Sequence, residues 1–273
     1  MTTPFIWDIR PEIFSFMPLP RWYSLIFAAG MIGGYMMMRA VFKRENKPVE
    51  LLDSLLVYIV FGTMIGMRLG HCFFYQPDYY LSHPWHIPMI WEGGYASHGG
   101  FLGVIIALWL FVRKYGNMTF LWLADRIAFA SMFAGGCIRV GNFFNSEMIG
   151  HPATVPWAVV FKRIDMVPRH PAQLYESVGY FAVCGLGWLA YRYTKTAALP
   201  GRLLGLIMIG GFGWRFFCEF FKEDQVAFEA GMKFNMGQLL SIPFIILGVF
   251  LVFGAFKRWQ RTTAAAPSKS VAA

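Results

Sequence analysis

Seven stretches of about 20 mostly apolar residues decide what kind of protein this chain can form. They cover about 21–42, 51–74, 96–113, 119–141, 171–191, 203–221 and 237–256. A helix of about 20 apolar residues is long enough to cross the hydrocarbon core of a bilayer. Apolar types make up 57% of the chain and charged types 14%, whereas about 25% of a soluble protein is charged. The sequence therefore predicts an all-α polytopic membrane protein with about seven transmembrane helices.

Lysines and arginines are unevenly divided between the loops that join these stretches. The loops after the first, third, fifth and seventh stretches carry twice as many of them as the other loops do. Because basic loops remain in the cytoplasm, we expect the N-terminus outside and the C-terminus in the cytoplasm. This topology, together with anionic membrane lipids, accounts for the net charge of +9. We therefore expect no nucleic-acid partner.

The seven stretches predict a single transmembrane domain over 1–261, with a small extracytoplasmic cap at about 142–170. Within this cap, VPWAVVFKR alternates in the manner of a β-strand. The N-terminal FIWDIRPEIFSF lacks the pattern of a cleavable signal peptide, and we interpret it as an interfacial segment. Residues 262–273 are of low complexity and are predicted to form a disordered cytoplasmic tail.

Small residues within the apolar stretches have structural explanations. Gly62, Gly66 and Gly70 recur at every fourth position, which lets two helix backbones approach closely. The four cysteines lie inside apolar stretches without a CxxC spacing, so we expect buried side chains and no metal site. These cysteines are Cys72, Cys137, Cys184 and Cys218.

Ionisable and amide side chains gather at the predicted outer ends of the helices, where such groups are costly and usually functional. If the helices form a bundle, these groups meet in one polar pocket at the level of the outer headgroups. The group comprises His98, Arg139, Asn142, Asn145, Glu147, His170, Gln173, Tyr175, Glu176, Arg215 and Glu219.

Several of these residues also have a purely structural interpretation. Arg215 and Glu219 are four apart on one helix and can simply pair with each other. Glu176 has the position of a carboxylate that stabilises a helix start, and Asp125 lies at a helix start too. Outside this group, Arg68 can belong to the edge of the pocket or form an interhelical bond. A functional role is favoured for His98, because the glycines that follow it allow a ligand to approach closely.

The chemistry of the cluster favours an oxyanion as ligand. Two arginines in a low-dielectric pocket bind phosphate and stabilise a departing phosphate group. A histidine with a pKa near 6.5 can accept a proton at neutral pH. In the outer leaflet the abundant phosphate is that of a phospholipid. The residues thus favour either an enzyme acting on a phospholipid headgroup or a lipid or anion transporter with an arginine-lined pocket.

Several ordered motifs resemble those of the prolipoprotein diacylglyceryl transferase family of bacteria. They are RWYSLIFAAG, EGGYASHGGFLG, RVGNFFNSEMIG, HPAQLYE, WRFFCEFF and MGQLLSIP. The match runs along most of the chain. It implies transfer of the sn-1,2-diacylglyceryl group of phosphatidylglycerol to the lipobox cysteine of a preprolipoprotein, with a thioether formed and glycerol 1-phosphate released.

The resemblance also implies roles for individual residues. His98, Arg139 and Arg215 are expected to be catalytic. We expect the arginines to hold the phosphate and His98 to activate the thiol or position the lipid. The substrate-binding residues are expected to be Tyr23, Arg139, Asn142, Glu147, Gly150 and Glu219. No metal or organic cofactor is expected. The expected location is the bacterial plasma (inner) membrane, with the active site facing the outer leaflet and the partners being phosphatidylglycerol and lipobox-bearing signal peptides.

Overall fold

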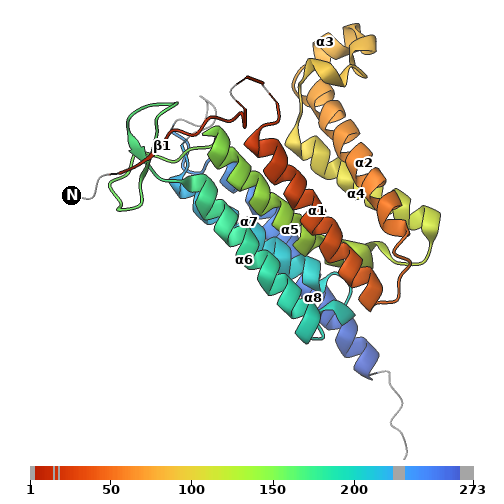
Figure 1. Cartoon of the computed structure of the whole chain (residues 1–273). Coiled ribbons are helices and arrows are strands. Elements are labelled where there is room, and N and C mark those ends of the chain that lie inside the picture. Colours follow the sequence, from red (N-terminus) through yellow and green to blue (C-terminus); the bar gives the residue numbers. More distant parts are fainter. Residues whose placement is uncertain (1–3, 15, 18, 224–230, 265–273) are drawn as a thin grey trace, which may run out of the picture. The chain divides into compact units, whose positions relative to one another are not determined.

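Long helices make up most of the protein in a computed structural model that describes residues 4–14, 16–17, 19–223 and 231–264 (Figure 1). The long helices are α1 (Trp22–Arg44), α2 (Leu51–Phe74), α4 (Ser97–Tyr115), α5 (Phe120–Asn145), α6 (Ala172–Tyr193), α7 (Arg202–Cys218) and α8 (Met236–Ala264). The shorter elements are β1 (Phe5–Trp7), α3 (Pro77–Ser82), β2 (Val159–Phe161), β3 (Pro168–Arg169) and 3-10 turns at Pro84–His86, Ile90–Glu92, Thr196–Ala198 and Glu219–Phe221. Most of the predicted disordered tail, 265–273, lies outside the described residues.

The long helices coincide with the seven apolar stretches to within a few residues, apart from α8, which continues beyond its predicted end. Among the described residues, five helical segments are long and apolar enough to cross a membrane. They are Trp22–Arg44, Leu51–Phe74, Phe120–Asn145, Arg202–Phe221 and Met236–Gly254. α4 and α6 are not among these five segments. The chain is therefore an all-α polytopic membrane protein, while seven crossings and their orientation stay a prediction.

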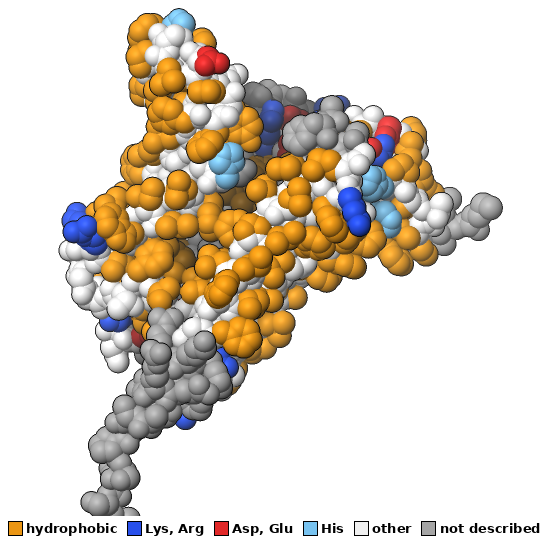
Figure 2. All heavy atoms as spheres, turned by 180° about the vertical axis from the view of Figure 1, so that it is seen from behind, with side chains coloured by type: hydrophobic (Ala, Val, Ile, Leu, Met, Phe, Trp, Pro, Cys, Tyr) orange, Lys and Arg blue, Asp and Glu red, His pale blue; other side chains and the backbone are white. Residues whose placement is uncertain are grey.

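Apolar side chains dominate the outside of the helices. Figure 2 shows hydrophobic side chains over most of the visible helix surface, with lysines and arginines mainly toward the ends. Large examples with at least half of their surface exposed include Phe61, Leu186 and Phe250. A water-soluble protein rarely exposes so extended an apolar surface. Contact with lipid accounts for it.

The chain divides into two compact units, which are described separately. The first consists of residues 1–37 and 125–273, and the second of residues 38–124. In the second unit α2 and α4 pack along the predicted glycine row. A Cβ on Gly66 would lie 2.3 Å from the carbonyl oxygen of Gly99, and one on Gly103 would lie 2.0 Å from that of Gly62. The prediction of close backbone contact is confirmed, because no larger side chain fits between the two helices.

In the first unit, α5, α6 and α7 are connected by specific polar contacts. The hydroxyl of Ser177 on α6 donates to the carbonyl oxygen of Gly136 on α5 at 3.0 Å. The carboxylate of Asp125 accepts from the backbone N–H groups of Gly201 and Leu204 at 2.8 and 2.7 Å. Asp125 is fully buried and so stabilises the start of α7, across from its own helix. Its predicted structural role is confirmed.

A three-stranded sheet forms the cap and packs on the end of α5. β2 lies in the centre, with β3 antiparallel on one side and β1 parallel on the other. Trp7, Phe143, Val159 and Phe161 form its buried core, with the Trp7 and Phe143 rings 4.4 Å apart. The predicted strand in VPWAVVFKR is confirmed. The N-terminal segment, interpreted as interfacial, supplies the additional strand β1.

All four cysteines are buried and free, as predicted from their apolar surroundings.

Candidate functional site

The end of α5 presents an arginine whose guanidinium is engaged on two sides. Arg139 Nε lies 2.7 Å from Glu176 Oε2, and its Nη1 donates to Asn142 Oδ1 at 3.2 Å. Asn142 in turn donates through Nδ2 to Glu147 Oε2 at 3.0 Å. Three residues that the sequence predicted as a group, Arg139, Asn142 and Glu147, are thus connected in one chain of hydrogen bonds.

The turn after α5 holds the carboxylate of Glu147 in place. Its Oε1 accepts from Asn145 Nδ2 at 3.2 Å, and its backbone carbonyl accepts from Gln173 Nε2 at 2.5 Å. On either side, Ser146 and Met148 adopt a left-handed conformation, each with φ of 56°. Non-glycine residues rarely adopt it, and such residues often occur at functional sites.

Glu176 is more than a carboxylate at a helix start, which was one interpretation of its sequence position. Its side chain is 1% exposed and forms the ion pair with Arg139. A buried charge without a partner is strongly destabilising, so the two groups depend on each other. Glu176 is therefore part of the polar cluster at the end of α5.

A second arginine lies among polar groups at the end of α7. Arg215 Nη2 is 3.4 Å from Glu219 Oε1, so the predicted pairing within one helix is present. Glu219 has two further partners, however. Lys222 Nζ lies 3.1 Å from Oε1, and Asn235 Nδ2 donates to Oε2 at 3.2 Å. Because Glu219 is held by these groups as well, Arg215 is not its sole counterion.

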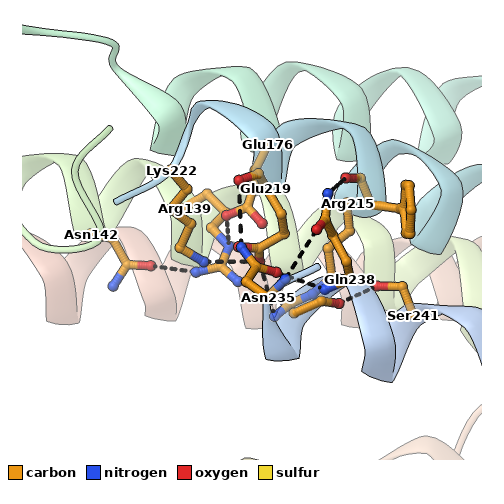
Figure 3. Close-up of polar contacts among 11 residues, drawn as sticks. Arg139, Asn142, Glu176, Arg215, Glu219, Lys222, Asn235, Gln238 and Ser241 are labelled. Carbon is orange, nitrogen blue, oxygen red and sulfur yellow. Dashed lines mark hydrogen bonds and ion pairs between the residues drawn. The ribbon is translucent and has the colours of Figure 1, made fainter. Parts of the chain in front are cut away.

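The two arginines belong to one cluster (Figure 3). Arg215 interacts electrostatically with Glu176, the ion-pair partner of Arg139, and Tyr180 interacts with both arginines. The cluster combines three cations with three carboxylates near the ends of α5, α6 and α7. These are Arg139, Arg215, Lys222, Glu147, Glu176 and Glu219. Guanidinium groups in such surroundings are suited to bind an oxyanion such as phosphate.

Tyr23 and Gly150 lie beside this cluster. A Cβ on Gly141 would lie 2.7 Å from the ring of Tyr23, and the tyrosine interacts electrostatically with Arg139 and Glu147. At Gly150 a Cβ would lie 2.5 Å from the carbonyl oxygens of both His170 and Phe221. Gly150 is therefore enclosed by backbone, and its lack of a side chain is required for packing.

Lys222, Asn235 and Gln238 belong to the cluster but are not among the residues predicted from the sequence. Lys222 is 4% exposed, although it lies in one of the loops whose lysines and arginines served to predict the topology. Its spacing of three from Glu219 was the available signal. Asn235 and Gln238 hydrogen-bond each other at the start of α8, where Gln238 Oε1 accepts from the backbone N–H of Asn235 at 3.1 Å.

His98 belongs to the second unit, at the start of α4. Its exposed ring stacks on Tyr75 at 5.7 Å between centroids and meets Phe74 edge-on at 5.6 Å. The interpretation of the following glycines as room for a ligand was wrong for Gly99. A Cβ there would lie 2.2 Å from the carbonyl oxygen of Gly66, so this glycine serves helix packing.

Arg68 organises the loop that precedes His98. Its guanidinium donates to the backbone carbonyls of His86, at 2.6 Å, of Ile87, at 2.9 Å, and of Gly93. It also lies 3.6 Å from the carboxylate of Glu92. The interhelical bond considered from the sequence is instead a set of bonds to the loop that follows α2. Arg68 is thereby committed to holding the loop between α2 and α4.

Comparisons with known proteins agree with the motifs. The sequence profile of the family "Prolipoprotein diacylglyceryl transferase" matches residues 11–254. The chain is 46% identical over 256 residues to the phosphatidylglycerol--prolipoprotein diacylglyceryl transferase of Tolumonas auensis, covering 93% of this chain and 99% of the relative. It is also 46% identical to the protein of that name from Chloroherpeton thalassium, with coverage of 93% and 95%, and 41% identical to that of Bacteroides fragilis, with coverage of 90% and 94%. The chain belongs to the prolipoprotein diacylglyceryl transferase family.

Proposed function

We propose that this protein transfers the sn-1,2-diacylglyceryl group of phosphatidylglycerol to the thiol of the lipobox cysteine in a preprolipoprotein signal peptide. The family assignment supports this reaction, and the names of the relatives specify the same lipid and the same class of acceptor. The observation that carries the proposal is the buried cluster in which Arg139 and Arg215 share Glu176 as a neighbour.

The chemistry is a displacement at the sn-3 carbon of the lipid. The cysteine sulfur forms a bond to this carbon, and the bond from the carbon to the phosphate oxygen breaks. Glycerol 1-phosphate leaves with the bonding electrons, and the thiol proton passes to a base or to the departing phosphate. A free thiol with a pKa near 8.5 is only slightly ionised at neutral pH, so a neighbouring base or positive charge accelerates the attack.

The described contacts suggest a role for each residue. Arg139 and Arg215 hold the phosphate and stabilise its departure, because charge develops there as the bond breaks. Asn142 and Glu147, already joined at 3.0 Å, orient the glycerol headgroup. Tyr23, Gly150 and Glu219 shape the binding site around them. His98 acts as base for the thiol. No step in this scheme calls for a metal or an organic cofactor.

The distribution of basic loops supports a location in the bacterial plasma (inner) membrane with the N-terminus outside. In this orientation the ends of α5 and α7 that carry the arginines face the outer leaflet, which is the periplasmic side in an envelope with two membranes. The cap of about 142–170 is then extracytoplasmic. One catalytic domain over 1–261 is proposed to contain all these groups.

A purified-enzyme assay tests this function. The protein in detergent micelles is incubated with phosphatidylglycerol and a synthetic lipobox peptide. We expect glycerol phosphate in solution and a peptide heavier by one diacylglyceryl group. A peptide with serine in place of cysteine is the control and should remain unmodified. Movement of lipid between vesicle leaflets without any modified peptide would instead support the transporter alternative, for which the family assignment gives no support.

A further inference from the structure

Helix α6 carries a polar partner for each of the two arginines. Glu176 forms the 2.7 Å ion pair with Arg139 of α5. Tyr180 hydrogen-bonds to Arg215 of α7. Glu176 and Tyr180 are four residues apart and therefore lie on one face of α6, one turn above the other. One helix thus contacts both guanidinium groups.

The other contacts of the two arginines come from the helix that carries each arginine or from the residues directly after it. Asn142, which bonds Arg139 at 3.2 Å, lies on the same helix as that arginine. Glu219, at 3.4 Å from Arg215, directly follows the helix that carries Arg215. Contacts within one helix end orient a side chain but do not fix its distance from another helix. The contacts from α6 connect separate helices and are able to fix that distance.

Helix α6 is firmly placed between α5 and α7 at this level. Toward α5, Ser177 donates to the carbonyl of Gly136 at 3.0 Å. Toward α7, the indole of Trp214 packs on Gly179, where an added Cβ would lie 1.9 Å from its ring. Trp214 Nε1 also donates to the backbone carbonyl of Tyr175 at 2.8 Å. Both neighbours of α6 are therefore held within one turn of Glu176 and Tyr180.

The ion pair of Arg139 leaves nitrogens for a ligand. Glu176 occupies the Nε edge, and Asn142 takes one hydrogen of Nη1. A guanidinium has five N–H donors, so these two contacts leave further donors for a phosphate. The second carboxylate oxygen of Glu176, Oε1, is buried and has no hydrogen-bond partner among the described residues. Because water does not reach Glu176 Oε1, the charge of this carboxylate is stabilised by the ion pair with Arg139 and not by solvent.

We propose that Glu176 and Tyr180 are positioning residues that set the spacing of Arg139 and Arg215 so that both guanidiniums engage the same phosphodiester. This inference rests on the proposed function, because it assigns the phosphate of the lipid substrate to both arginines. It assigns no contact with substrate to Glu176 or Tyr180. Their effect on turnover passes through the arginine that each one holds.

Kinetics of conservative variants test the proposal. Glu176→Gln keeps an acceptor oxygen but removes the charge, and Tyr180→Phe removes only the hydroxyl. We expect each to lower kcat for phosphatidylglycerol by about tenfold, since small displacements of catalytic groups are costly. Glu176→Leu, which has no acceptor, should lower it further. Tyr191→Phe, a buried tyrosine farther along α6, is the matched control and should retain the wild-type kcat.

Double variants distinguish positioning from a merely structural role. Glu176→Gln should have a much smaller effect in an Arg139→Lys background than in the wild type, and Tyr180→Phe should lose its effect in Arg215→Lys. The crossed pairs should be closer to additive. Wild-type kinetics in both single variants, additivity within the matched pairs, or activity lost only in proportion to unfolded protein would overturn the proposal.

Binding of fluorescent phosphatidylglycerol to the same proteins separates this inference from the proposed function. A wild-type enzyme that releases no glycerol phosphate refutes the transferase assignment. Even then, weaker phosphatidylglycerol binding by Glu176→Gln and Tyr180→Phe supports the shared phosphate site. Unchanged lipid binding by both variants refutes it.

Discussion

Arg139 Nε lies 2.7 Å from Glu176 Oε2, so an ion pair joins α5 to α6. This ion pair orients the guanidinium, whose Nη1 also donates to Asn142 Oδ1 at 3.2 Å. A lysine at the same position has a single nitrogen for all these contacts. The geometry therefore favours arginine over lysine at this position of the proposed phosphate site.

Arg139→Lys and Arg215→Lys should each lower kcat/KM for phosphatidylglycerol by about 100-fold, the loss typical of removing one donor to a developing negative charge. The release of glycerol phosphate measures this effect. Arg163→Lys, on the exposed surface of the cap, is the control and should keep the wild-type rate. An unchanged rate in either of the first two variants would contradict the assignment of the phosphate site.

His98→Gln tests the proposed base. If His98 accepts the thiol proton, the wild-type enzyme does not depend on prior ionisation of the thiol. The variant should then be slower and should depend instead on the ionisation of the thiol, near pH 8.5. His83→Gln, in the exposed loop after α3, serves as control. A normal rate and pH profile in His98→Gln would remove the base role.

Gly150→Ala should destabilise the protein, because the new Cβ would lie 2.5 Å from two backbone carbonyl oxygens. We expect a lower unfolding temperature together with lower activity. Gly185→Ala is the matched control, since a Cβ at that position of α6 meets no atom within 4 Å. There alanine should leave the stability unchanged or raise it. Normal stability in Gly150→Ala would show that the glycine is needed for substrate alone.

Asp165→Asn should make the stability of the cap less dependent on pH. Hydrogen bonds from Arg169 hold the pKa of Asp165 below its ordinary value. A carboxylate with a lowered pKa stabilises the folded state above about pH 4 and loses this contribution as the pH falls through the folded-state pKa. The wild type should therefore unfold at a higher temperature than the variant at neutral pH, and the two should converge in acid. Asp8→Asn, which breaks an exposed ion pair with Lys162, should change little.

Asp125→Ala should lower the free energy of unfolding by about 1 to 2 kcal/mol, the cost typical of losing the side-chain cap of a helix. It removes the acceptor for the backbone N–H groups of Gly201 and Leu204. Thermal unfolding in detergent measures the loss. The control is Asp78→Ala in the exposed first turn of α3. Equal stability of the two variants would show that the start of α7 needs no acceptor from α5.

The sequence predicted the helices well because a membrane span has a simple requirement of length and polarity. It also predicted that Arg139 and Arg215 lie among other polar groups near the ends of their helices, since charged groups there stand out from their apolar surroundings. The grouping of Arg139, Asn142 and Glu147 agrees with the observed hydrogen bonds. Their roles in binding and catalysis remain predictions.

Contacts between segments that are far apart in the chain could not be predicted from the sequence. Glu176 follows Gln173 by three residues, which suggests a helix start, but its partner lies on another helix. Lys222 was assigned to a loop, although it is buried against Glu219. Gly99 was interpreted as room for a ligand, whereas it contacts the backbone of α2. In each case local spacing is compatible with several partners, and only the packing selects one.

The parallel pairing of β1 with β2 has a consequence for how the protein is made. Phe5 is aligned with Val159, so the beginning of the chain cannot complete its sheet until more than half of the polypeptide has left the ribosome. Until then Trp7 lacks its aromatic neighbour Phe143. Folding of the cap is accordingly a late step in biogenesis. Deleting residues from the N-terminus should therefore impair the folding of the cap more than the membrane insertion of the first helices.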